Sequence, residues 1–327
     1  MNGSRSYNHS VMKSAAVALT VLLFLISGAI AQAPKATPPA KSAPDLTLDA
    51  PITLDVTRVN ILYTVTDKKG RFVKNLTRDD FDITENKKKQ NILEFTAETD
   101  LPLRIALLID TSNSIRERFR FLQDSAINFI VTAMRPDLDR AMIVTFDSQA
   151  QLNVGLTTDK TLLQTTVRRL RPGGGTALND AIVLASQQLM LDQPRDKYRR
   201  AIILLSDGED NLSLYSRAQA LEFAHKADTV IYAVSTNITH LETSGDKVLK
   251  RLAVETGGLA IFPFKIEDLD QSFVNVLNEL RNQYNVLYRP EPMFADGKYH
   301  SVDIRVKTAG DYIVRARQGY YAPGPPK

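Results

Sequence analysis

The sequence predicts an α/β protein: a doubly wound, mostly parallel sheet inserted in a β-sandwich built from the N- and C-terminal segments. Uninterrupted apolar runs such as Ile105–Ile109 and Ile202–Leu205 are typical of strands buried on both faces of a parallel sheet. Segments with helical apolar spacing separate these runs, and such alternation indicates a doubly wound sheet. Towards both ends of the chain, apolar and polar residues alternate instead, as in strands with one buried face.

Residues 1–31 are predicted to be a secretory signal peptide. Arg5 and Lys13 precede the apolar run Ala15–Ile26, and Ala29-Ile30-Ala31 fits a cleavage site. The run is short for a bilayer span, so we expect cleavage rather than anchoring. Removal of the two basic residues lowers the formal net charge from +4 to +2, and no basic stripe indicates nucleic-acid binding.

Residues 32–50, rich in Ala, Pro and Lys, are expected to form a disordered linker. The chain has no cysteine, so an exported form needs a hydrophobic core in place of disulfides and has no lipobox for a lipid anchor. We therefore expect a periplasmic or extracellular protein without a stable membrane anchor after signal cleavage.

Residues 51–99 are expected to supply the first half of the β-sandwich. Alternating apolar residues run from Val59 to Val65, and Phe81 and Ile83 alternate again before a charged turn, Glu85 to Lys89. With the segment Ile92 to Phe95, this makes three or four strands, too few to bury both faces of a sheet.

Residues 283–322 are expected to supply the missing strands. The alternation returns in three stretches around Tyr284–Tyr288, Val302–Val306 and Tyr312–Ala316. Residues 101–282 then form the inserted α/β domain, and residues 323–327 a disordered tail.

The inserted domain is predicted to alternate strands and helices. Its first helix, Phe119 to Met134, repeats apolar residues on one face and stops before Pro136. The further strands are expected at 141–146, 151–156, 201–205, 229–234 and 259–262, and the further helices at 161–170, 177–191, 217–226, 247–255 and 266–280.

Side chains with oxygen atoms cluster at the carboxyl ends of the predicted parallel strands, which share one edge of the sheet. Asp110, Ser112 and Ser114 follow the first buried strand at alternate positions. Thr176 follows Gly173-Gly174-Gly175 ahead of a helix, and Asp207 ends a second buried strand. Open α/β sheets bind ligands at the carboxyl ends of their strands.

The donor types favour a hard cation. Hydroxyl and carboxylate oxygens without nearby His or Cys suit Mg²⁺ (or Mn²⁺ or Ca²⁺) better than zinc or iron. Mg²⁺ wants near-octahedral oxygens and usually retains waters or takes a ligand from its partner, and this set leaves room for either.

The pattern Asp110-x-Ser112-x-Ser114, followed by Thr176 and Asp207, resembles the metal-ion-dependent adhesion site of von Willebrand factor type A (VWFA) domains. The resemblance implies a metal held by these five residues, which binds an Asp or Glu carboxylate of a protein or peptide partner. Including the end Arg317-Gln-Gly-Tyr320, the whole layout resembles the secreted VWFA-related proteins of acidobacteria.

Two alternatives remain open beside this adhesion-like binding function. One is a structural module whose metal only stabilises the loops. The other, which the sequence supports less, is a metal-dependent hydrolase. Ser112 stands where a phosphoryl-transfer Asp of the haloacid dehalogenase type needs a second acid, and there is no Gly-x-Ser-x-Gly motif. His225, His240 and His300 are scattered as surface or packing residues, so we expect no enzyme.

Overall fold

The computed structural model describes residues 58–97, 101–192, 197–237, 241–263, 266–308 and 310–325. The predicted signal peptide and linker lie outside this part of the chain. All the described residues belong to one compact unit. None of the helices in the described part is both long and apolar enough to cross a bilayer.

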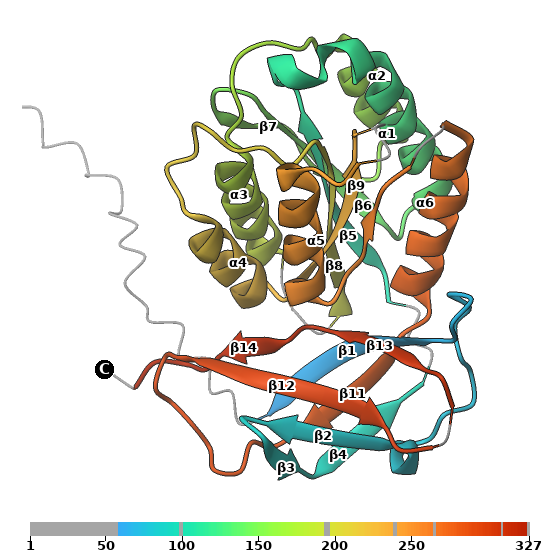
Figure 1. The fold of residues 1–327 in the computed structure, drawn as a ribbon, viewed down its shortest axis with the longest axis vertical. Helices are drawn as coiled ribbons and strands as arrows, with labels where there is room; N and C mark the ends of the chain where they lie inside the picture. Colours follow the sequence, from blue (N-terminus) through green and yellow to red (C-terminus); the bar gives the residue numbers. More distant parts are fainter. Residues whose placement is uncertain are drawn as a thin grey trace, which may run out of the picture. The chain divides into compact units, whose positions relative to one another are not determined.

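A six-stranded sheet forms the centre of the α/β lobe (Figure 1). Its strand order is β10-β9-β8-β5-β6-β7, parallel except for β7, which runs antiparallel to β6 at one edge. The strands are β5 (Leu103–Asp110), β6 (Arg140–Phe146), β7 (Ala150–Thr157), β8 (Arg199–Ser206), β9 (Thr229–Ser235) and β10 (Ala260–Ile261).

Helices cover both faces of this sheet, as its uninterrupted apolar strands require. Every residue of β5 and β8 is buried. Residues of α1, α2 and α6 pack with Leu103, Ile105 and Leu107 in one core, and those of α3, α4 and α5 pack with Ala106 and Leu108 in a second. The helices are α1 (Phe119–Ala133), α2 (Lys160–Arg169), α3 (Leu178–Leu191), α4 (Arg217–Lys226), α5 (Ser244–Thr256) and α6 (Ile266–Arg281).

Local hydrogen bonds set where several helices begin. The Asp159 carboxylate accepts from the Leu162 N–H at the start of α2. Thr243 and Asp246 form a capping box, so α5 begins at Ser244, three residues before the start that its apolar spacing predicted.

The N- and C-terminal segments build two four-stranded sheets together, of orders β13-β1-β11-β4 and β14-β12-β2-β3. Each sheet therefore mixes strands from both ends of the chain, as the predicted fold class requires. The strands are β1 (Val59–Thr66), β2 (Phe81–Glu85), β3 (Lys88–Gln90), β4 (Ile92–Thr96), β11 (Tyr284–Tyr288), β12 (Tyr299–Val306), β13 (Ile313–Ala316) and β14 (Gly319–Tyr321).

The inner faces of these sheets share one core, in which aromatic rings cluster. The Tyr284 ring lies 5.6 Å from those of Tyr63 and Phe95, centroid to centroid, and 5.4 Å from that of Phe72. Together with the mostly parallel sheet, this confirms the predicted fold class.

The C-terminal segment continues to make backbone hydrogen bonds beyond β14. Ala322 is buried and its N–H donates to the Lys298 carbonyl, while the Pro323 carbonyl accepts from the Gly297 N–H. Pro323, where the sequence predicted a disordered tail to begin, thus takes part in a backbone hydrogen bond. The last two residues, 326–327, lie outside the described part.

Candidate functional site

The loop after β5 is folded by its own side chains. The Asp110 Oδ1 accepts from the Ser112 N–H at 2.9 Å, and the hydroxyls of Ser112 and Ser114 lie 2.9 Å apart. Thr111 points the other way, since its hydroxyl donates to the Phe146 carbonyl of β6. The short 3-10 helix η2 (Asn113–Arg118) then leads into α1. Three of the five predicted site residues thus form one cluster.

The Thr176 loop is joined to this cluster by backbone hydrogen bonds. The Gly173 N–H donates to the Thr111 carbonyl at 2.6 Å, and the Asn113 N–H donates to the Gly174 carbonyl at 3.1 Å. Thr176 itself is buried, and its N–H donates to the Asn211 Oδ1. The fourth predicted residue therefore lies on a loop bound directly to the Asp110 loop.

Two of the three glycines of this loop, Gly174 and Gly175, lie where a side chain would meet close neighbours. Gly174 has φ +78°, and a Cβ there would lie 2.6 Å from the Ser148 hydroxyl oxygen. That hydroxyl accepts from the Gly175 N–H at 3.2 Å.

Asp207, the fifth predicted residue, lies at the end of β8, next to β5 in the sheet. The negative charge of Asp207 helps to raise the pKa of Asp110. The backbone here touches α5: Gly208 has φ +83°, and a Cβ on it would lie 2.2 Å from the Gly245 carbonyl oxygen. A Cβ on Gly245 would in turn lie 2.0 Å from the Asp207 carbonyl oxygen, so the backbone at Asp207 packs directly against the start of α5.

Burial dominates the electrostatics of Asp110. Its side chain is fully buried, and desolvation raises its pKa to about 6, with a contribution from the negative charge of Asp207. Hydrogen bonds from Ser112 and Ser206 act in the opposite direction. A cation between the two carboxylates would relieve both the desolvation and their mutual repulsion.

Two further residues support the site and were not predicted. The Ser206 hydroxyl donates to the Asp110 Oδ2 at 2.7 Å, so it orients this carboxylate from the neighbouring strand. Asn211 holds Thr176 through its side-chain oxygen. Ser206 could have been noticed, because it ends a buried strand next to the strand of Asp110; nothing in the sequence pairs Asn211 with Thr176.

The donor set fits a hard divalent cation. Two carboxylate residues and three hydroxyl residues lie in loops at the same sheet edge, and oxygen donors of this kind suit Mg²⁺ or Mn²⁺. Within the described residues, no group of three or more His, Cys, Asp or Glu side chains is placed to hold a metal; a cation at Asp110 and Asp207 would therefore need hydroxyl oxygens as further ligands.

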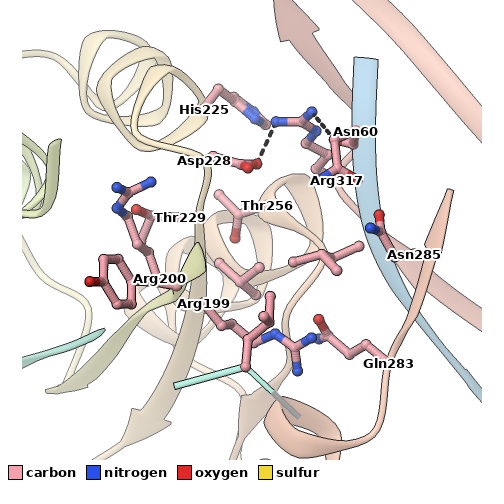
Figure 2. Close-up of a pocket in the computed structure, with 14 residues that line it drawn as sticks. Asn60, Arg199, Arg200, His225, Asp228, Thr229, Thr256, Gln283, Asn285 and Arg317 are labelled. Carbon is pink, nitrogen blue, oxygen red and sulfur yellow. Dashed lines mark hydrogen bonds and ion pairs between the residues drawn. The ribbon is translucent and has the colours of Figure 1, made fainter. Parts of the chain in front are cut away.

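A separate polar cavity of about 40 Å³ lies between the two lobes (Figure 2). Arg317 closes one side: its Nη1 pairs with Asp228 at 2.6 Å, and its Nη2 donates to the Asn60 carbonyl at 2.7 Å. The amide oxygens of Gln283 and Asn285 are buried there, and no described residue donates a hydrogen bond to them. This volume suits a few water molecules rather than a metabolite.

One known protein family matches the part of the chain that contains most of the candidate site. Residues 105–209 match the model of the von Willebrand factor type A domain. The matched segment contains all five predicted site residues. No curated protein matches the chain significantly.

Solved structures give further likenesses. A von Willebrand factor type A protein from Catenulispora acidiphila is 14% identical, with 75% of this chain and 74% of that one covered and a TM-score of 0.49. An aerotolerance-related membrane protein from Bacteroides fragilis is 18% identical (54% and 99% covered, TM-score 0.44). Proximal thread matrix protein 1 from the mussel byssus, with a zinc-occupied MIDAS motif, is 19% identical (60% and 49%, TM-score 0.47). At such TM-scores, nothing about this chain's function follows from them.

Proposed function

Since the chain carries a von Willebrand factor type A domain, we propose that it is a protein- or peptide-binding module that uses a divalent cation to coordinate a partner's carboxylate. The proposed metal residues are Asp110, Ser112, Ser114, Thr176 and Asp207. What supports the proposal most is the convergence of three oxygen-bearing segments at one sheet edge, two of them tied together by backbone hydrogen bonds.

The protein's own groups have defined parts in this proposal. Ser206 and the Ser112 N–H orient the Asp110 carboxylate, and Asn211 holds Thr176 in place. Ser114 is exposed, so the cluster is open to a partner on that side. When bound, the cation supplies a Lewis-acidic position for a carboxylate oxygen of the partner.

The metal site is tested by thermal melts of residues 32–327 with Mg²⁺, with Mn²⁺ and with EDTA. Binding to the folded state alone stabilises it, by about 2.7 kcal/mol when the metal is at a hundred times its dissociation constant. We expect Asp110→Ala to lose this response and Asp79→Ala, a change at an exposed sandwich acid, to keep it. A wild-type melting temperature that does not change with millimolar metal would refute the metal site.

The carboxylate ligand is tested with two peptides that differ by Glu against Gln at one position. We expect the Glu peptide to bind in Mg²⁺ and to be released by EDTA while the fold remains. If the metal raises the melting temperature but both peptides behave alike, the structural-module alternative holds. Turnover of a substrate that depends on Asp110 would favour the hydrolase alternative.

The proposed place of action is the periplasm or the exterior of the cell. It rests on the signal-peptide pattern of residues 1–31. Comparing the N-terminus of the protein in cell fractions tests it: cleavage after Ala31 and absence from the cytosol are the expected results.

A further inference from the structure

A groove with a strongly basic rim lies beside the candidate metal edge, between α1 and the end of α2. Its volume is about 450 Å³. Four exposed arginines line it, with Asp124 as the one acidic side chain among the lining residues: Arg116, Arg120, Arg168 and Arg171. We call this surface the arginine groove.

The four guanidinium groups have no carboxylate partner among the described residues. Arg116 donates to the Asn113 Oδ1 and the Pro172 carbonyl, and Arg171 donates to the carbonyls of Arg168 and Leu170. These acceptors are neutral, so the groove keeps an excess of positive charge, with four arginines against the one carboxylate of Asp124. Arginine is always charged and its planar fork matches a carboxylate, which makes this rim complementary to acidic side chains.

The floor of the arginine groove is apolar. Phe119 and Ile127 are both core residues that reach its surface, and Leu170 packs against the same core. From Phe119 to Ile127 the helix rises about 12 Å, the length of about four residues of extended chain. The groove therefore fits a short extended segment that lays apolar atoms on the floor and carboxylates on the rim.

The groove is continuous with the candidate metal site. Arg116 lies two residues after Ser114 and bridges Asn113 to Pro172, which directly precedes the Thr176 loop. The Asn113 N–H is itself bonded to that loop at Gly174. A chain that leaves the metal edge over Asn113 thus enters the groove.

We propose that the partner is an acidic peptide segment, with one carboxylate at the metal and further Asp or Glu side chains on the arginine groove. This inference rests on the proposed function, since the metal fixes where the segment begins. The groove supplies selectivity for several acidic residues in sequence over a single carboxylate.

The test uses two fluorescein-labelled peptides of equal length, one with a single Glu among Gln and Gly, the other with several of those Gln residues changed to Glu. Anisotropy is measured in Mg²⁺ and in EDTA with residues 32–327. In Mg²⁺ we expect the acidic peptide to bind about tenfold tighter or more, with an advantage that shrinks as salt rises.

The double variant Arg168→Gln with Arg171→Gln should remove this advantage and leave the single-Glu peptide unchanged. The matched control, Lys69→Gln with Lys88→Gln, removes the same charge from the sandwich and should keep the advantage. Both pairs are exposed, so neither change disturbs the core.

The outcomes separate this inference from the proposed function. Mg²⁺-dependent binding that ignores the arginine changes overturns the groove and leaves the metal site. Arginine-dependent binding that survives EDTA and Asp110→Ala supports the groove and overturns the metal site. Binding of neither peptide overturns both, and tighter binding of a single-stranded oligonucleotide than of the acidic peptide overturns the assignment of a peptide.

Discussion

At the scale of single residues, the buried carboxylate of Asp110 is the strongest argument for the proposed cation. It accepts hydrogen bonds from Ser112 and Ser206, yet burial still raises its pKa to about 6. Relative to the ordinary Asp pKa of 3.8, holding this group ionised at neutral pH costs the metal-free fold about 3 kcal/mol. A fold tolerates such an unfavourable buried charge most readily where a bound ligand stabilises it.

Asp110→Asn should therefore have opposite effects with and without metal. In EDTA at pH 7 we expect the variant to match or exceed the stability of the wild type, because a neutral amide replaces a desolvated charge. In Mg²⁺ only the wild type should gain stability. Urea unfolding in both buffers measures how the difference in stability between variant and wild type changes with metal. A variant that is much less stable than the wild type in EDTA would assign Asp110 a purely structural role.

His225 gives a prediction for pH. Burial, followed by the positive charge of Arg317, lowers its pKa to about 4, while Glu255 and Asp228 act weakly the other way. Between pH 6.5 and pH 4 the unfolded chain binds a proton that the folded chain does not, so this group's contribution to stability falls as the pH falls, by about 3 kcal/mol in all.

His225→Phe should flatten this part of the pH profile, since the phenyl ring keeps the packing against Tyr299, whose ring centroid lies 5.4 Å away. The measurement is urea unfolding of both proteins at pH 7 and near pH 4. The carboxylates shared by both proteins cancel in the difference. Equal losses in the two proteins would contradict the cause assigned here.

At the scale of elements, the crossing of the β8 end over α5 controls the position of Asp207. Gly245→Ala would place a Cβ 2.0 Å from the Asp207 carbonyl oxygen, so the two segments must separate. We expect a loss of about 1–3 kcal/mol in stability and a weaker metal response.

Gly155→Ala in β7 is the matched control, because a Cβ there meets nothing within 4 Å. Metal titrations followed by thermal melts compare the two variants. An unchanged metal response in Gly245→Ala would show that the position of Asp207 at the sheet edge does not matter for metal binding.

The regular elements could be predicted because their apolar spacing is strong. α4 begins and ends where its spacing placed it, and β5 is buried over its full length as its apolar run required. The three-residue strand β3 overlaps a predicted charged turn, and β14 was not predicted as a strand. Such short strands are defined by their partners, β2 and β12, rather than by their own residues.

The same limit applies to the candidate site. A local motif predicted Asp110, Ser112 and Ser114 because their spacing is visible along one loop. The contact of Ser206 with Asp110 and the contact of Asn211 with Thr176 join segments far apart in sequence, so only the folded chain reveals them. The finer resemblance to the acidobacterial VWFA-related proteins stays a prediction.

At the scale of the whole molecule, polar contacts join the sandwich strands to the α/β lobe. Arg315 of β13 pairs with Glu279 of α6, and Arg317 pairs with Asp228. Burial raises the pKa of Glu279, and the Arg315 guanidinium opposes this. An unpaired Glu279 would therefore be costly, and the lobes should unfold together.

Arg315→Met should lower stability by about 3 kcal/mol, since it strands a buried carboxylate, and Glu279→Gln in the same chain should restore part of that loss. Arg305→Met is the matched control: its pair with Asp303 is largely exposed and worth little. Calorimetry measures all four proteins and should show one transition in each. Equal effects of the two arginine changes would contradict this coupling.

The placement of β5 has a mechanical consequence. The strand runs through the middle of the sheet, paired with β6 from Arg104 to Asp110 and with β8 from Leu103 to Ile109, and the candidate site lies at its carboxyl end. A tether pulling on a partner held there loads β5 along its own axis. Both ladders are then strained in shear, so their hydrogen bonds must break together rather than one after another. Such a strand resists extraction under tension, so we expect a partner bound as proposed to be released before the fold is pulled apart.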